Sequence, residues 1–219
     1  LINPLAATDA DLIVDDLSSS ATDLEFYAAA GGRAIVDMGP ADYGRSIDDL
    51  LWLAQRTSVH MLVTTGHHKH LIAAPLVGQD SVDVIAARNI KEIRDGIGGT
   101  TARAGVIKAG TSLSDITSVE RRVLQAAAET QRQTGLTIST HTELGTMAIE
   151  QIEILAAAGA DPGRVILGHM DARLGERAEL LAVLATGAFV SFDRWTRFAM
   201  APDERRAAAE RRQELAPLR

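Results

Sequence analysis

The sequence predicts an α/β fold in which parallel strands alternate with helices. Two observations support this prediction: short runs rich in apolar and β-branched residues recur along the chain, and stretches with helical spacing of apolar residues separate them. Strands of this kind are buried on both faces by helices. The repeat of roughly 30 residues suits a (β/α) barrel or a doubly wound sheet.

The first half of the chain contains two predicted strands, residues 33–39 and 60–66. Gly31 and Gly32 end a helix before the first of them. Between the strands, apolar residues at helical spacing predict a second helix: Ile47, Leu50, Leu51 and Ala54. The stretch 67–101 holds "HHKH" and "DGIGGTT", and we expect a loose, looped connection there.

The second half of the chain is more regular. It contains four more predicted strands: 104–110, 136–142, 164–171 and 188–193. Thr117 and Glu120 form a capping-box pattern that opens a helix running to Gly135. Two further helical patterns end near Gly159 and Gly187. No G-x-G-x-x-G follows a strand, which makes a dinucleotide-binding sheet the weaker choice.

Composition narrows the class of protein. The 219 residues suit one domain spanning 1–219, and the net charge of −7 argues against nucleic acid or an anionic membrane as partner. Without cysteine, disulfides and thiolate metal sites are excluded, and we expect a cytoplasmic protein. No apolar run is long enough to span a membrane. The chain begins without Met and ends within a helical pattern, so we expect both ends to be incomplete.

Three polar residues stand at equivalent places in the repeat. Lys108, His141 and His169 each end a predicted strand, one βα unit apart. The carboxyl ends of parallel barrel strands converge on one mouth, where active sites lie. Neutral imidazole binds zinc and similar metals, but two histidines are too few for a complete catalytic site. The ammonium group of an ordinary lysine has no lone pair and cannot bind a metal. Three roles therefore stay open for Lys108: a Schiff-base amine, a substrate-binding cation, or a carbamate formed with carbon dioxide.

Several motifs resemble the phosphotriesterase family of the amidohydrolase superfamily, and most of all its phosphotriesterase-like lactonases. They are "GVIKAGTS", "ISTHTELGTMAIEQIEIL", "RVILGHMD" and "GAFVSFD". The resemblance runs from "GGRAIVDMG" to "APDERR". It implies a TIM (β/α)8 barrel that is incomplete here, with barrel strands two to seven visible.

The resemblance also implies a binuclear metal centre. Lys108, carboxylated by CO2, would bridge two divalent ions, zinc or else manganese, cobalt or iron, and His141 and His169 would bind one of them. A hydroxide bridging the metals would attack the substrate. Asp171 matches an acid used in proton shuttling, while its other interpretation is a helix N-cap.

The residue after the aspartate of the last visible strand indicates the substrate class. Arg194 stands where lactonase-type relatives have arginine and organophosphate hydrolases have histidine. We therefore expect a small-molecule lactone or ester as substrate, including phosphorylated sugar lactones, with promiscuous phosphotriesterase activity. His68, Lys69, Arg194 and Trp195 are the expected pocket residues. The resemblance further implies a homodimer.

Two departures from the family pattern keep other functions open. The family's first strand carries a His-x-His pair and its eighth a ligating aspartate, and this sequence shows neither in place. His68 and His70 have the His-x-His spacing but follow a later strand. The alternatives are a Schiff-base lyase that uses Lys108 and a degenerate, non-catalytic barrel.

Overall fold

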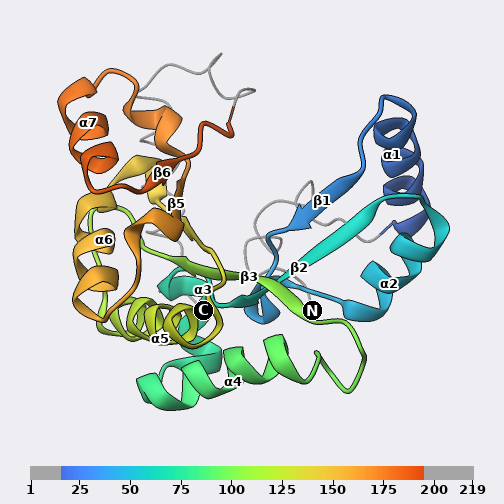
Figure 1. The fold of residues 1–219 in the computed structure, drawn as a ribbon, viewed down its shortest axis with the longest axis horizontal. Coiled ribbons are helices and arrows are strands. Elements are labelled where there is room, and N and C mark those ends of the chain that lie inside the picture. The colour runs from blue at the N-terminus through green and yellow to red at the C-terminus, as the bar shows by residue number, and fades with distance from the viewer. Residues whose placement is uncertain (1–15, 195–219) are drawn as a thin grey trace.

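A computed structural model describes residues 16–194, in which six strands form one parallel sheet in sequence order. The strands are β1 (Ala34–Asp37), β2 (His60–Gly66), β3 (Ala104–Gly110), β4 (Ile138–His141), β5 (Val165–Gly168) and β6 (Phe189–Val190). The sheet curls into an open arc with helices along its outer side (Figure 1). The predicted α/β class is therefore confirmed, as an incomplete TIM barrel.

Seven α-helices are found in this described range. They are α1 (Leu17–Ala29), α2 (Ile47–Arg56), α3 (His70–Val77), α4 (Val82–Arg94), α5 (Ser118–Thr134), α6 (Ala148–Ala157) and α7 (Arg177–Ala185). Short 3-10 turns also occur: η3 (Ala41–Tyr43), η4 (Glu143–Gly145), η5 (Pro162–Arg164) and η6 (Met170–Arg173). Between residues 16 and 194, no helix has both the length and the apolar character needed to cross a membrane.

The expectation of a loose connection over 67–101 is wrong, because this stretch contains α3 and α4. The first of these, HLIAAPLV, is almost entirely apolar and includes Pro75, so it lacks an amphipathic pattern. The second begins after Ser81, whose hydroxyl accepts a hydrogen bond from Val84 N. Its buried face includes the polar Asn89, which interrupts the apolar stripe that would have predicted a helix.

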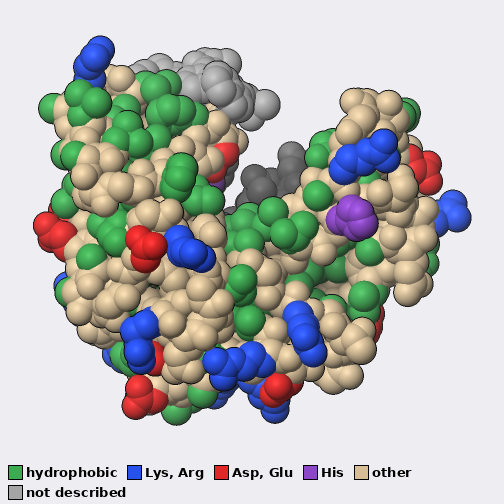
Figure 2. All heavy atoms as spheres, in the orientation of Figure 1, with side chains coloured by type: hydrophobic (Ala, Val, Ile, Leu, Met, Phe, Trp, Pro, Cys, Tyr) green, Lys and Arg blue, Asp and Glu red, His purple; other side chains and the backbone are tan. Residues whose placement is uncertain are grey.

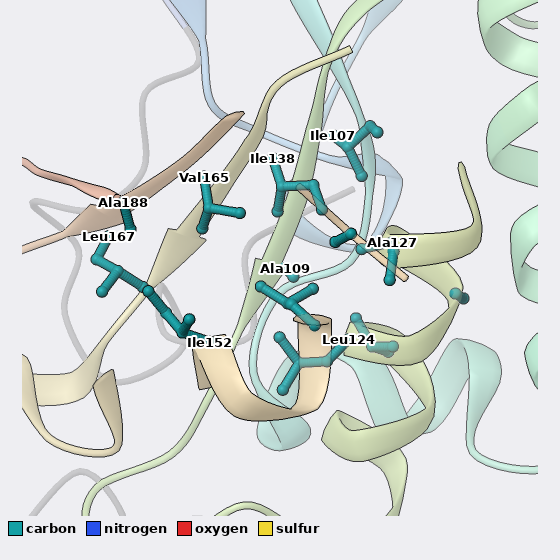
Figure 3. Packing of buried hydrophobic residues seen from close by; sticks show 14 of the residues in the cluster. Ile107, Ala109, Leu124, Ala127, Ile138, Ile152, Val165, Leu167 and Ala188 are labelled. Carbon is teal, nitrogen blue, oxygen red and sulfur yellow. The ribbon is translucent and has the colours of Figure 1, made fainter. Parts of the chain in front are cut away.

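The main core lies between the sheet and the helices outside it. Residues of β3, β4 and β5 point toward α5 and α6 and pack there (Figure 3): Ile107, Ala109, Ile138, Val165 and Leu167 against Leu124, Ala127 and Ile152. All of these side chains are nearly or completely buried. This packing fixes the strand ends from which the functional side chains project.

The predicted capping box at the start of α5 is confirmed, and it does more than begin a helix. Thr117 Oγ1 accepts from Glu120 N at 3.2 Å, and Glu120 Oε2 accepts from Thr117 N at 2.8 Å. Glu120 Oε1 also accepts from His70 N at 2.8 Å and from Ser112 Oγ at 2.7 Å. One buried carboxylate therefore joins α5, the start of α3 and the loop after β3.

The inner face of the arc is partly open to solvent. Figure 2 shows the surface hollowed between the part formed by α7 and β6 and the part formed by α1 and β1. Val36 on β1 is 43% exposed and Leu62 on β2 is 39% exposed, although both lie within strands. In a closed barrel such inward side chains are covered by the other strands.

Candidate active site at the strand ends

The structure brings the three predicted strand-end residues to one mouth of the arc. Gly110 pairs in register with His141, so Lys108, two residues before Gly110, faces the same side as His141. The ring centroids of His141 and His169 are 4.8 Å apart in an edge-on arrangement. Two histidines and a lysine from three consecutive strands therefore share one site.

The Lys108 amine is buried at this mouth, and its backbone is held by β2. Gly66 has φ +92°, and a Cβ there would lie 2.0 Å from Lys108 O, so only glycine fits. The pKa of the Lys108 amine is lowered to about 8, mainly because the amine is buried; the Arg194 charge adds to this shift, while Asp193 and Asp42 oppose it. A neutral, nucleophilic amine is thus accessible near neutral pH.

His141 is buried and neutral. Burial lowers the pKa of its imidazole to about 3, against the opposing effect of Glu143. Its Nε2 is 2.9 Å from Glu143 Oε2. The ring centroid of His68 is 4.5 Å from that of His141, and the His68 ring stacks on Tyr43 with a centroid distance of 4.7 Å. These contacts leave the imidazole little freedom to rotate.

Glu143 is a site residue that the sequence analysis missed. Burial by itself would raise the pKa of its carboxyl group, but the His141 hydrogen bond and the Lys69 charge outweigh this and lower it. Its Oε2 contacts both His141 Nε2 and Lys69 Nζ. An acidic residue two places after a strand-end histidine was the signal that could have revealed it.

His169 is oriented by a second carboxylate. Its Nδ1 is 2.7 Å from Asp193 Oδ1, and Ser191 Oγ donates to Asp193 Oδ2 at 3.1 Å. Burial raises the pKa of Asp193, but the hydrogen bond from His169 outweighs this, so the net shift is downward. Asp193 therefore remains a carboxylate, and His169 Nδ1 donates to it.

Backbone strain is concentrated around this mouth. Four residues other than glycine have positive φ within the described range, and each follows a strand end: Ser114, Leu144, Met147 and His169. His169 itself has φ +65°. Such conformations cost about 1–3 kcal/mol each and occur most often at active and binding sites.

Asp171 lies inside the 3-10 turn η6 and is 3% exposed. The N-cap interpretation is wrong, because His169 occupies the N-cap position of η6 and Glu176 that of α7. Asp171 Oδ1 is buried without a hydrogen-bond partner among residues 16–194. The proton-shuttle role stays a prediction, and the unpaired oxygen is compatible with it.

The structure places three of the four expected pocket residues close to the strand-end site. His68 and Lys69 are buried beside His141 and Glu143 rather than exposed on a solvated loop. Arg194 lies close enough to Lys108 to lower its pKa. Trp195 falls outside the described residues.

Asp42 anchors the segment that contains these residues. Its side chain is 1% exposed, and its Oδ2 accepts from His68 N at 3.0 Å and lies 3.4 Å from His67 Nδ1. His70 is exposed, with its Nδ1 3.1 Å from Thr117 Oγ1. His68 and His70 therefore do not share a site, and their spacing does not form a metal-binding pair.

The donor atoms fit part of a metal centre. No three His, Asp or Glu side chains within 16–194 are arranged to hold a metal ion by themselves. His141 and His169 each have one ring nitrogen hydrogen-bonded to a carboxylate, as metal-binding histidines usually do. A carbamate on Lys108 would add an oxygen donor to the two imidazoles, and these residue types suit zinc.

Comparison with known proteins identifies relatives of this chain. The phosphotriesterase family model matches residues 3–213. The chain is 33% identical over 199 residues to the phosphotriesterase homology protein of Escherichia coli, covering 90% of this chain and 68% of that protein. It is 28% identical to a phospho-furanose lactonase of Mycoplasmopsis agalactiae, covering 88% of this chain and 59% of that protein.

Solved structures show the same likeness in three dimensions. The crystal structure of the Escherichia coli phosphotriesterase homology protein, complexed with phosphate in its active site, matches with a TM-score of 0.86 and 32% identity, over 95% of this chain and 72% of that one. A lactonase from Listeria monocytogenes matches with a TM-score of 0.85 and 32% identity, over 95% of this chain and 69% of that one. Together with the family model, these matches show that the chain belongs to the phosphotriesterase family.

Proposed function

We propose that this chain forms the metal-binding and catalytic part of a hydrolase that opens lactones. The observation that carries the proposal is the convergence of Lys108, His141 and His169 at one mouth of the sheet. Membership of a family whose relatives include two lactonases supports the reaction class. A lactone with a phosphorylated sugar ring is the preferred substrate class, because one of these relatives is a phospho-furanose lactonase.

In this proposal each residue has a defined task. His141 and His169 would hold a divalent ion, and carboxylated Lys108 would supply an oxygen ligand to the metal centre. Bound divalent ions lower the pKa of water and polarise the carbonyl oxygen under attack. Asp171, with one buried oxygen unpaired in the described part of the chain, would accept the proton that attack releases. Arg194, beside Lys108, would bind a negatively charged group of the substrate.

The depressed pKa of Lys108 also favours a second candidate. A Schiff-base lyase requires a lysine that is neutral near pH 7, and burial moves Lys108 in that direction. The paired histidines have no evident task in that reaction. Borohydride reduction with a carbonyl substrate distinguishes the two, because only the lyase would leave a covalent adduct on Lys108.

The test of the hydrolase is a lactone panel on the whole chain loaded with zinc or manganese. Ring opening is followed by proton release, before and after addition of a chelator. We expect hydrolysis that the chelator abolishes and that Lys108→Ala removes, while Lys91→Ala, on the exposed surface of α4, retains it. Hydrolysis that survives both metal removal and Lys108→Ala would refute the mechanism.

A further inference from the structure

A buried relay of three side chains passes from the loop after β2 to the end of β4. Lys69 Nζ contacts Glu143 Oε2, and the same oxygen lies 2.9 Å from His141 Nε2. The three residues are 6%, 4% and 5% exposed. Nothing in the proposed hydrolysis requires an ion pair at this depth, and a buried pair carries a desolvation cost.

The contacts determine which nitrogen of His141 bears a proton. An ammonium can only donate hydrogen bonds, so Glu143 Oε2 acts as an acceptor toward Lys69. The same oxygen must then receive its second hydrogen bond from His141, which places the proton on Nε2. The lone pair of the neutral ring is left on Nδ1, and none of the hydrogen bonds within residues 16–194 involves that nitrogen.

His169 shows the opposite arrangement. Its Nδ1 donates to Asp193 at 2.7 Å, which leaves the lone pair on Nε2. The two imidazoles, 4.8 Å apart, are therefore prepared in opposite tautomers by two different carboxylates. A carboxylate that accepts one ring N–H fixes the tautomer and orientation of a metal-binding histidine.

We propose that Glu143, held by Lys69, is a positioning residue that fixes His141 as the Nε2–H tautomer and so presents Nδ1 for metal binding. This inference rests on the proposed metal-dependent function and adds two residues to its machinery. It also assigns Lys69 a task other than direct substrate binding. The conservative change Glu143→Gln keeps the size of the side chain but removes its charge and offers an amide donor toward the ring.

Tautomers are measured directly in the metal-free chain. Long-range proton–nitrogen NMR correlations on histidine labelled with nitrogen-15 distinguish a ring protonated on Nε2 from one protonated on Nδ1. We expect His141 to be protonated on Nε2 and His169 on Nδ1, with each signal assigned by its loss in a single His→Gln variant. A His141 ring protonated on Nδ1 would overturn the inference, and this result would not depend on whether a Glu143 or Lys69 variant folds.

Variants then test whether the relay affects metal binding. In Glu143→Gln we expect a mixture of His141 tautomers and a loss of about 10–100-fold in zinc affinity, measured by competition with a coloured chelator. The control Glu153→Gln makes the same chemical change on the exposed side of α6 and should leave both readouts unchanged. Unchanged tautomer and affinity in Glu143→Gln would contradict the proposal.

A double-mutant cycle tests whether Lys69 and Glu143 act together. Lys69→Met and Glu143→Gln combined should lose less zinc affinity than the product of the two single losses. Fully multiplicative losses would show that Lys69 does not act through Glu143. If the unchanged chain bound no zinc, the hydrolase proposal would fail, whereas the tautomer measurement would still decide the state of His141.

Discussion

At the scale of single residues, the chemistry of Lys108 depends on its proton. A lysine amine reacts with carbon dioxide only when it is unprotonated, and burial lowers the pKa of Lys108 to about 8. The ammonium form therefore dominates below that pH and the reactive amine above it. At constant CO2 pressure we expect a carbamate on Lys108 to increase as pH rises through about 8, measured by NMR with carbon-13-labelled CO2.

The matched variants for this measurement are Lys108→Ala and Lys91→Ala. The carbamate signal of a buried lysine should vanish in the first and persist in the second, because Lys91 is exposed on α4. A signal that both variants retain would place the carbamate elsewhere and remove the chemical basis for Lys108 as a metal ligand.

The residues of the site were predictable to the extent that they end strands. Lys108, His141 and His169 follow from the spacing of the repeat, since strand ends in a parallel sheet meet at one edge. Glu143 and Asp42 do not, because each acts from a 3-10 turn whose path is set by tertiary contacts. Lys69 was expected to line the substrate pocket. Its contact with Glu143 could not be predicted, because the two residues are 74 positions apart in the chain.

At the scale of elements, the approach of β2 to β3 depends on one glycine. Gly66→Ala would place a Cβ 2.0 Å from Lys108 O at a positive φ, so we expect a loss of at least ~2 kcal/mol in the free energy of unfolding. Urea denaturation measures it. Gly175→Ala, where nothing lies within 4 Å of the added methyl group, should change stability by less than about 0.5 kcal/mol; equal effects would refute the packing argument.

The elements themselves were predictable where one signal was strong. All six strands and the capping box at Thr117 and Glu120 were found at their expected places. β2 and β3 have the predicted bounds, whereas the other four strands are shorter than expected, with only Phe189–Val190 paired within 188–193. Helices α3 and α4 were missed because Pro75 and the buried Asn89 break the patterns by which helices are predicted.

At the scale of the whole molecule, the arc has a covered outer face and an open inner one. Leu167 is completely buried in the outer core, whereas Leu62 on the inner side of β2 is 39% exposed. Leu167→Ala should therefore lower the free energy of unfolding by about 2–5 kcal/mol, and Leu62→Ala by less than about 1 kcal/mol. Denaturant titration measures both, and equally large losses would mean that the inner face is covered in solution.

The proposed hydrolase depends above all on Lys108 belonging to a metal centre with His141 and His169. Zinc titration of the metal-free whole chain, in buffer supplied with bicarbonate, tests it most directly. We expect zinc binding that weakens at least about 100-fold in Lys108→Ala, while circular dichroism shows that the fold is retained and Lys91→Ala binds zinc normally. Zinc affinity and stoichiometry that stay unchanged in Lys108→Ala would show that Lys108 is not part of the metal centre.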